Sequence, residues 1–206
     1  MFVIWNLGFV ISNTMLEKIK TIREKIGAGM VDIKKALIEA KGNEEKAIEL
    51  LRKSGKAKAI KKSERTAKEG IVASYIHSNK RVGVMIKLLC ETDFVARNSD
   101  FQELAKDICM HIAGMNPKFL KPEDVSSEIV DEEKEIWKEQ LKNEGKPEAM
   151  LAKIMEGKEK KFREESALLT QPFVKNPDIT VEELIAEKIG VIGENIQIGK
   201  FIRYEL

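Results

Sequence analysis

Residues 70–90 read GIVASYIHSNKRVGVMIKLLC, and this stretch decides the fold class. Its two halves, 70–76 and 82–90, are rich in valine, isoleucine and other residues that favour β-strands. The residues between them, 77–80, are His-Ser-Asn-Lys, which is polar and typical of a tight turn. The stretch therefore predicts two strands joined by a short turn.

The segments that follow favour helices and one more strand. Apolar residues three, four or seven positions apart predict a helix over 99–115, and Gly114, Asn116 and Pro117 end it. A last helix is expected over 180–189 and a third strand over 195–204. The fold class is therefore predicted to be α+β, with a three-stranded antiparallel sheet faced by helices.

Two charged segments, 126–144 and 146–165, also have helical periodicity and flank the breaker Gly145-Lys146-Pro147. They predict a helical hairpin over about 126–165 that projects from a core domain spanning 70–206.

Residues 15–54 predict a small domain of three short helices, because apolar positions recur at helical spacing on each side of two glycine-containing breaks. The first break is Gly27-Ala28-Gly29 and the second contains Gly42. The following segment, 55–69, is predicted to be a basic linker that is partly helical. Residues 1–14 form an uncharged apolar leader that lacks a convincing secretory signal pattern. We interpret it as an upstream start or a short accessory tail.

Composition and motifs argue against an enzyme. The chain has two histidines, His77 and His111, and two cysteines, Cys90 and Cys109, which are far apart in the sequence. This pattern predicts neither a disulfide framework nor a metal site, and it fits a reducing cytoplasm. No nucleophile motif or phosphate-binding glycine loop is present. The sequence predicts no catalytic residue, no cofactor and no membrane span.

Charge is distributed unevenly along the chain. Residues 15–65 hold 15 Lys and Arg against 8 Asp and Glu, whereas the whole chain has a net charge of only +2. A basic head of this kind could bind RNA, an acidic protein surface or nothing. RNA binding is disfavoured because 15–65 contains no aromatic side chain for base stacking. We therefore expect no direct contact with nucleic acid.

The segment ETDFVARN at 91–98 is a surface connection, because it lies between a predicted strand and a predicted helix. Phe94 has two interpretations from the residues alone. It could lie beneath the sheet, or it could be exposed and insert into a partner.

Four motifs together resemble the elongation factor Ts family. They are IREKIGAGMVDIKKAL at 22–37, TDFVAR at 92–97, MHIA and PKFLKPEDV at 110–113 and 117–125, and the run from MEGK at 155–158 to QPFV at 171–174. They occur in the family's order and cover nearly all of 15–206. The departures are Ile26, Val31, Lys87 and Leu89, where the family usually has other residues.

The resemblance implies a ubiquitin-associated-like head and a core domain that both bind the GTPase domain of elongation factor Tu. It implies nucleotide exchange without catalysis, in which Asp93 and Phe94 approach the partner's magnesium and nucleotide. The partner-binding residues that it implies are Arg23, Met30, Val31, Thr92, Asp93, Phe94, Val95, Met110 and His111. A ubiquitin-binding adaptor is an alternative for the head, but it leaves the core motifs unexplained.

The resemblance also raises the question of assembly, because longer family members have a doubled core in which the phenylalanine and the histidine come from different copies. Here a single core carries both. His111 is 12 residues along its predicted helix from Ser99, which is about 18 Å of helix axis. A homodimer in which Phe94 of one subunit works beside His111 of the other is therefore expected. The alternative is a monomer in which His111 packs within its own domain.

Overall fold

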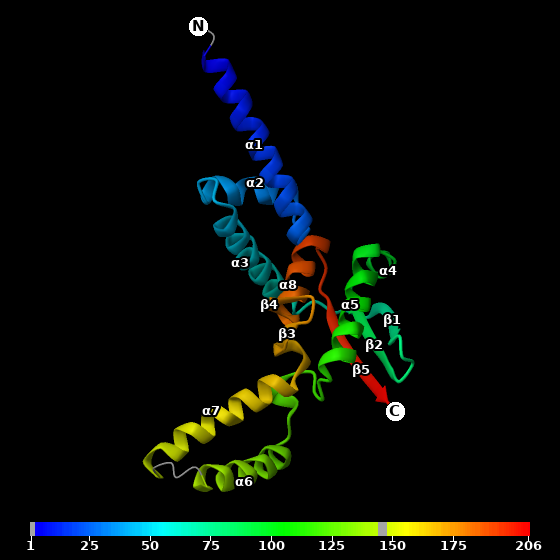
Figure 1. The fold of residues 1–206 in the computed structure, drawn as a ribbon. Helices are drawn as coiled ribbons and strands as arrows, with labels where there is room; N and C mark the ends of the chain where they lie inside the picture. Colours follow the sequence, from blue (N-terminus) through cyan, green and yellow to red (C-terminus); the bar gives the residue numbers. More distant parts are fainter. Residues whose placement is uncertain (1–2, 144–147) are drawn as a thin grey trace. The chain divides into compact units, whose positions relative to one another are not determined.

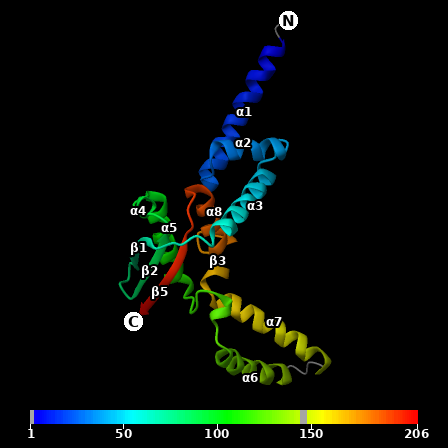
Figure 2. The same ribbon diagram turned by 180° about the vertical axis from the view of Figure 1, so that it is seen from behind.

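The computed structural model describes the backbone of residues 3–143 and 148–206 and the side chains of residues 15–143 and 150–206 (Figure 1; Figure 2). Its helices and its three-stranded sheet confirm the α+β class. The chain divides into two compact units, and each division falls inside a strand or a helix. Unit 1 contains Met1–Ile71, Leu88–Leu104 and Glu183–Gln197, and unit 2 contains Val72–Lys87, Ala105–Glu182 and Ile198–Leu206.

Unit 1 begins with three helices, which we call the head: α1 (Val3–Ile26), α2 (Met30–Glu39) and α3 (Glu44–Lys62). Two glycines with positive φ, Gly27 at 66° and Gly42 at 80°, lie in the two breaks, where glycine adopts a backbone that other residues rarely do. Helix α1 starts before the predicted residue 15. The side chains of the predicted leader, 1–14, lie outside the described residues.

A small apolar cluster holds the head together. Each of the three helices contributes to it, which agrees with the predicted periodicity, and Asn43 caps α3 by accepting a hydrogen bond from the Lys46 amide at 2.9 Å. The buried members are Ile19, Ile22, Ile33, Ala36, Leu37 and Ala47. The described helices agree with a three-helix head, whereas its likeness to ubiquitin-associated domains and its boundary at residue 54 remain predictions.

Helix α3 continues eight residues past Ser54, where the predicted three-helix domain ends, into the predicted partly helical linker. The continuation packs against α8 (Val181–Ile192). Gly55 and Gly190 approach so closely that a Cβ on Gly190 would lie 3.4 Å from the Gly55 Cα. Arg52 pairs with Glu187 at 3.1 Å beside this crossing. Part of the predicted linker is therefore helix, stabilised by contacts with α8.

The central sheet has the order β1-β2-β5, formed by β1 (Glu69–Ile76), β2 (Val82–Cys90) and β5 (Gln197–Glu205). The His77 amide donates to the Val82 carbonyl and closes the predicted turn. The Leu206 amide donates to the Arg81 carbonyl, so the end of β5 lies beside the start of β2 and these strands are antiparallel.

Burial alternates along β2, as expected for a sheet that is covered on one face. Val84, Ile86, Leu88 and Cys90 are buried, whereas Met85 and Lys87 are exposed. Within unit 2, the Cys109 thiol on α5 (Ser99–Met115) bonds to the backbone of Ile86, so α5 lies against the covered face.

Unit 2 also contains α6 (Ser127–Asn143) and α7 (Glu148–Ser166), which agree with the two predicted helices. The Trp137 and Phe162 rings meet edge to face with centroids 5.8 Å apart, and Lys134 pairs with Glu159 at 2.8 Å. The predicted breaker residues 145–147 lie outside the described residues.

Several short elements were not predicted. They are the strand pair β3 (Pro172–Phe173) and β4 (Asn176–Thr180), the four-residue helix α4 (Asp93–Ala96), and 3-10 turns at Pro122–Asp124 and Leu168–Thr170. Each is too short for helical or strand periodicity to reveal.

Candidate partner-binding site

The wedge segment, residues 92–97, presents an aromatic side chain to solvent. Thr92 has an extended backbone and caps α4, because its hydroxyl accepts a hydrogen bond from the Val95 amide at 3.4 Å. Phe94 is 81% exposed, and Asp93 pairs with Arg97 at 2.9 Å one turn along the helix. Of the two placements that the sequence left open for Phe94, the structure has the exposed one.

The head carries a second set of predicted contact residues. Arg23 lies near the end of α1, and Met30 and Val31 begin α2 after the Gly27-Ala28-Gly29 turn. All three side chains are exposed. Met30 and Val31 expose apolar surface and Arg23 exposes a cationic group, and both kinds of side chain are common where proteins bind one another. Their role in binding remains a prediction.

His111 is located differently, because it is fully buried in unit 2. Its Nδ1 accepts a hydrogen bond from the Val174 amide at 3.2 Å, so the ring proton is on Nε2, which donates to Gln171 Oε1 at 3.0 Å. Burial lowers the pKa of His111, and the bond to Gln171 offsets part of that shift. The neighbouring Met110 is half-buried.

The structure thus separates the predicted site residues by exposure. Phe94 and the three head residues can meet a partner from the surface, whereas the His111 imidazole makes internal bonds. The residue that sequence reasoning missed is Gln171, whose Nε2 donates to the Glu165 carbonyl at 2.7 Å while its Oε1 accepts from His111.

The cysteines provide no reactive thiolate. Both are buried, and burial raises the pKa of the Cys109 thiol to about 11. Burial also raises the pKa of Cys90, with a smaller contribution from the Glu194 carboxylate. A thiol with a raised pKa stays protonated at neutral pH and is a poor nucleophile or metal ligand. Among the residues that the structure describes, no three His, Cys, Asp or Glu side chains form a group that could hold a metal ion.

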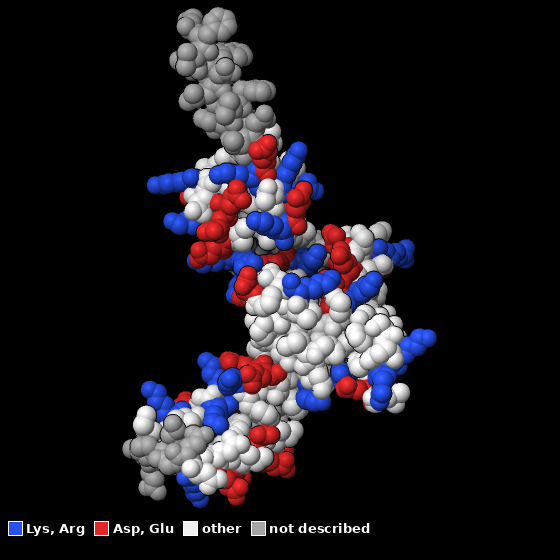
Figure 3. Space-filling model, in the orientation of Figure 1, with Lys and Arg blue, Asp and Glu red and all other residues white. Residues whose placement is uncertain are grey.

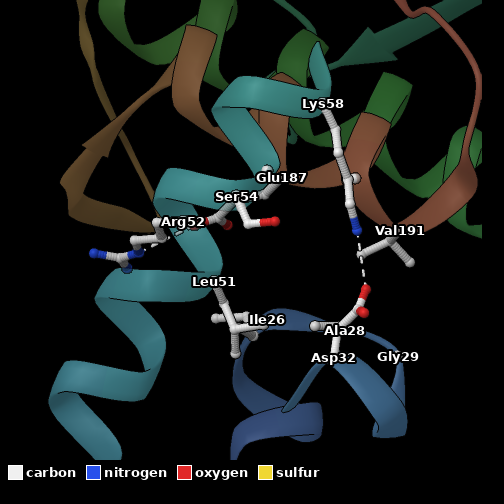
Figure 4. Close-up of a pocket in the computed structure, with 12 residues that line it drawn as sticks. Ile26, Ala28, Gly29, Asp32, Leu51, Arg52, Ser54, Lys58, Glu187 and Val191 are labelled. Carbon is white, nitrogen blue, oxygen red and sulfur yellow. Dashed lines mark hydrogen bonds and ion pairs between the residues drawn. The ribbon is translucent and has the colours of Figure 1, made fainter. Parts of the chain in front are cut away.

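A small pocket in unit 1 lies between the α1–α2 turn, α3 and α8 (Figure 4). It holds about 40 Å³, room for a few water molecules. Two ion pairs line it, Lys58 with Asp32 at 2.9 Å and Arg52 with Glu187 at 3.1 Å. Burial raises the pKa of Glu187, and Arg52 offsets part of that shift. The pocket is a packing defect where α3 meets α8 and is too small for a nucleotide.

The surface of the head carries both signs of charge. Figure 3 shows acidic side chains interspersed with basic ones over these helices, although the segment has a net positive charge. Ion pairs such as Lys53–Glu49 at 2.7 Å neutralise part of that charge locally. On the face drawn in Figure 3, this pattern differs from the continuous basic surface that follows a nucleic-acid backbone. Throughout the described chain, moreover, every helix is too short or too polar to cross a bilayer.

These features define a class of protein, an α+β protein with a three-helix head and an exposed aromatic side chain on a short capped helix. Comparison with known proteins then gives the family. The family model described as "Elongation factor TS" matches residues 9–206. Elongation factor Ts of Thermosipho melanesiensis is 53% identical over 186 residues, covering 90% of this chain and 95% of that protein.

Two further relatives agree. Elongation factor Ts of Carboxydothermus hydrogenoformans is 51% identical over 190 residues, which cover 92% of this chain and 88% of the relative. Elongation factor Ts of Fervidobacterium nodosum is 48% identical over 190 residues, covering 92% of this chain and 96% of the relative. The chain belongs to the elongation factor Ts family, and this confirms the resemblance that the four sequence motifs indicated.

Proposed function

We propose that this chain is a guanine-nucleotide exchange factor that binds elongation factor Tu in its GDP form and promotes GDP release. The observation that supports this most directly is the exposure of Phe94 on a short capped helix. An aromatic side chain that is 81% exposed gains little from its own fold. It gains by entering a partner, where buried aromatic residues contribute most of the binding energy.

The proposed mechanism needs two effects from the wedge segment. Phe94 enters the GTPase domain and displaces partner groups that surround the magnesium and phosphates. Asp93 brings a negative charge near the phosphate oxygens, where like charges repel strongly because water is excluded. Thr92 and Val95 flank them and contact the same partner. A factor that binds the nucleotide-free partner more tightly lowers nucleotide affinity by the same ratio.

The head would supply binding energy at a distance from the nucleotide. Arg23, Met30 and Val31 are exposed, and they lie before and after the turn at Gly27. Met110 is half-buried and remains a proposed contact, whereas the proposed contact through the fully buried His111 would require its two internal hydrogen bonds to break. Exchange forms no covalent bond, so the proposal requires no catalytic residue, cofactor or metal in this chain. The site of action would be the cytoplasm, where translation occurs.

We also propose that the chain works as a homodimer. Within unit 2, one face of the sheet is apolar and exposed. The two backbone bonds that set the strand registers, His77 to Val82 and Arg81 to Leu206, place Ile76, Met85 and Tyr204 on the same face. The exposed apolar side chains there are Val72, Ile76, Met85, Ile202 and Tyr204. A twofold axis would bury this face against its own copy.

The exchange function is tested by mixing the protein with elongation factor Tu that carries fluorescently labelled GDP. We expect release to accelerate in proportion to the added protein until it saturates. A release rate that stays at the spontaneous value would overturn the function. Binding of bare RNA that weakens steeply with salt would favour the alternative reading of the basic head.

The dimer is tested by light scattering at micromolar concentration. We expect a mass near twice 23.4 kDa, and a monomer for Met85→Glu, which places a charge at the centre of the apolar face. The control is Lys142→Glu, which reverses a charge at an exposed position of α6, outside the sheet. A wild-type mass near 23.4 kDa with full exchange activity contradicts the dimer.

A further inference from the structure

The Glu194 side chain, in the loop after α8, binds the start of the wedge segment. Its Oε2 accepts hydrogen bonds from the Glu91 and Thr92 amides, each at 3.0 Å. Its Oε1 accepts a third from the Thr92 hydroxyl at 2.7 Å. All of these residues belong to unit 1. The Glu194 carboxylate thus binds two consecutive backbone amides and one hydroxyl. Thr92, which supplies the second amide and the hydroxyl, is 102 residues from Glu194 in the sequence.

Glu91 returns the contact. Its Oε1 accepts a hydrogen bond from the Asn195 amide at 2.7 Å, and its Oε2 lies 3.6 Å from Arg65 Nη1. Asn195 is almost fully buried, and its Nδ2 donates to the Arg65 carbonyl at 2.7 Å. We call Glu91, Glu194, Asn195 and Arg65 the clasp. Each of its two loops supplies a carboxylate that binds an amide of the other.

The clasp reaches the wedge segment at Thr92, through the amide and the hydroxyl of that residue. Thr92 Oγ1 donates to Glu194 and accepts from the Val95 amide, the third residue of α4. A helix of four residues is not stable by itself, because nucleation costs more than its few hydrogen bonds return. The Asp93–Arg97 ion pair is exposed and contributes little. The clasp therefore fixes the start of the wedge segment, while the buried Ala96 side chain and a 3.5 Å bond from Gln102 Nε2 to the Ala96 carbonyl hold its end.

We propose that Glu194 is a positioning residue for Phe94, which holds the wedge segment in the orientation that exchange requires. This rests on the proposed function. Glu194 acts through Thr92 and makes no contact with the nucleotide. A wedge that is fixed before binding loses less conformational entropy when it enters the partner, so more of the binding energy remains for displacing the nucleotide.

The negative charge of Glu194 matters as well as its shape. Hydrogen bonds to an ionised acceptor are roughly twice as strong as neutral ones. Glu194→Gln keeps one oxygen for the two amides but replaces the charged acceptor with a neutral group. Glu194→Ala removes all three bonds. The expected order of activity is therefore wild type, then Glu194→Gln, then Glu194→Ala.

The first experiment measures release of labelled GDP from elongation factor Tu as the concentration of full-length variant is raised. Glu194→Ala should lower the maximal release rate about tenfold and change the half-saturating concentration less than about twofold. In a Phe94→Ala background, the same change should alter the maximal rate less than about twofold, since no wedge is left to position. Glu182→Ala, which removes an exposed carboxylate at the start of α8, is the control and should behave as wild type.

If Glu194→Ala lowers the maximal release rate by the same factor with Phe94 and in the Phe94→Ala background, the proposal is overturned, because Glu194 would then act independently of the wedge. A change that appears only in the half-saturating concentration also overturns it. Near-wild-type thermal unfolding of Glu194→Gln separates these outcomes from a failure to fold.

The second experiment is independent of exchange activity. Amide hydrogen exchange by NMR should show faster exchange at Glu91, Thr92 and Val95 in Glu194→Ala, with unchanged protection in α2 of the head. Unchanged protection at those three amides overturns the proposal even if GDP release falls. If the wild-type protein fails to accelerate GDP release from elongation factor Tu, the proposed function fails. The hydrogen exchange of the three amides still decides whether Glu194 holds the wedge segment.

Discussion

Phe94 and His111 carry the same expected role, a contact with elongation factor Tu, yet one is exposed and the other is buried. Phe94 lies on a capped four-residue helix with its ring in solvent. His111 lies inside unit 2, and both ring nitrogens are bonded to groups of the same chain. Exposure makes Phe94 available to a partner at little cost. Moving His111 to a surface would break two internal hydrogen bonds.

The contrast teaches that one family resemblance can cover residues with two physical roles. A side chain that binds a partner can be changed with little loss of stability, whereas a buried and bonded side chain cannot. Stability and exchange measurements on the two positions should therefore give opposite patterns, and the following variants are chosen to break or sharpen that difference.

The largest effect is expected for His111→Ala. The substitution removes a fully buried ring and leaves Gln171 Oε1 and the Val174 amide without their present partner. Each unsatisfied group costs about 1–3 kcal/mol, so the free energy of unfolding should fall by about 3 kcal/mol. Urea unfolding measures it.

The chain provides a matched control for this variant. His77 is exposed in the β1–β2 turn, where its ring lies near Tyr75. His77→Ala should change the free energy of unfolding by less than about 0.5 kcal/mol. Equal effects at the two histidines would contradict the structural role of His111.

Phe94→Ala should give the reverse pattern. Truncating a central aromatic contact costs about 2 kcal/mol, which corresponds to a roughly thirtyfold slower GDP release at a fixed subsaturating concentration. The melting temperature should not fall, because the ring packs against little of its own chain. Ile60→Ala, at another exposed apolar position, is the control and should leave both quantities unchanged. An early-melting Phe94→Ala would show that the ring is part of the fold.

The buried imidazole should also make stability depend on pH. Burial lowers the pKa of His111 from its ordinary 6.5, so the unfolded chain takes up this proton at a higher pH than the folded chain does. The contribution of neutral His111 is complete above pH 6.5 and is lost as the pH falls from there through the folded pKa. Urea unfolding at several pH values measures this loss.

His111→Gln is the comparison for the pH series. Glutamine has a donor and an acceptor but does not titrate, and the other ionisable groups are common to both chains. The wild type should lose more stability than His111→Gln as the pH falls below 6.5. Parallel curves of unfolding free energy against pH would mean that folding does not change the proton affinity of His111.

Much of the fold could be predicted because it depends on local patterns. The strands around 77–80 and the helix over 99–115 follow from side-chain periodicity and turn residues, and the structure confirms them. The sequence predicts a partly helical linker over 55–69, but the residue at which α3 ends, Lys62, could not be predicted. Gly55 is a weak helix former by itself, and the helix passes through it because it meets Gly190 on α8, a contact that no local pattern contains.

The candidate site shows the same limit. The position of His111 three residues after Ile108 and seven after Leu104 places it on the apolar stripe of α5, so periodicity alone favoured burial. The exposure of Phe94 had no such signal, since four residues are too few to show a period. Glu194 and Thr92 meet across 102 residues, and only the folded chain brings them together.

The smallest effect is expected for the ion pair within the wedge segment. Asp93 and Arg97 lie 2.9 Å apart, but both side chains are substantially exposed. Water and salt screen such a pair, and holding two side chains in one geometry costs entropy, so Arg97→Ala should change the free energy of unfolding by less than about 0.5 kcal/mol. Urea unfolding at low and high salt measures the change, which should shrink as salt rises.

Arg97→Lys, which keeps the charge, is the control. A loss of stability as large as that of His111→Ala would mean that the pair, rather than the clasp, holds α4 in place. The distinction matters for exchange, because a weak pair leaves the Asp93 carboxylate free to turn toward the partner's phosphates.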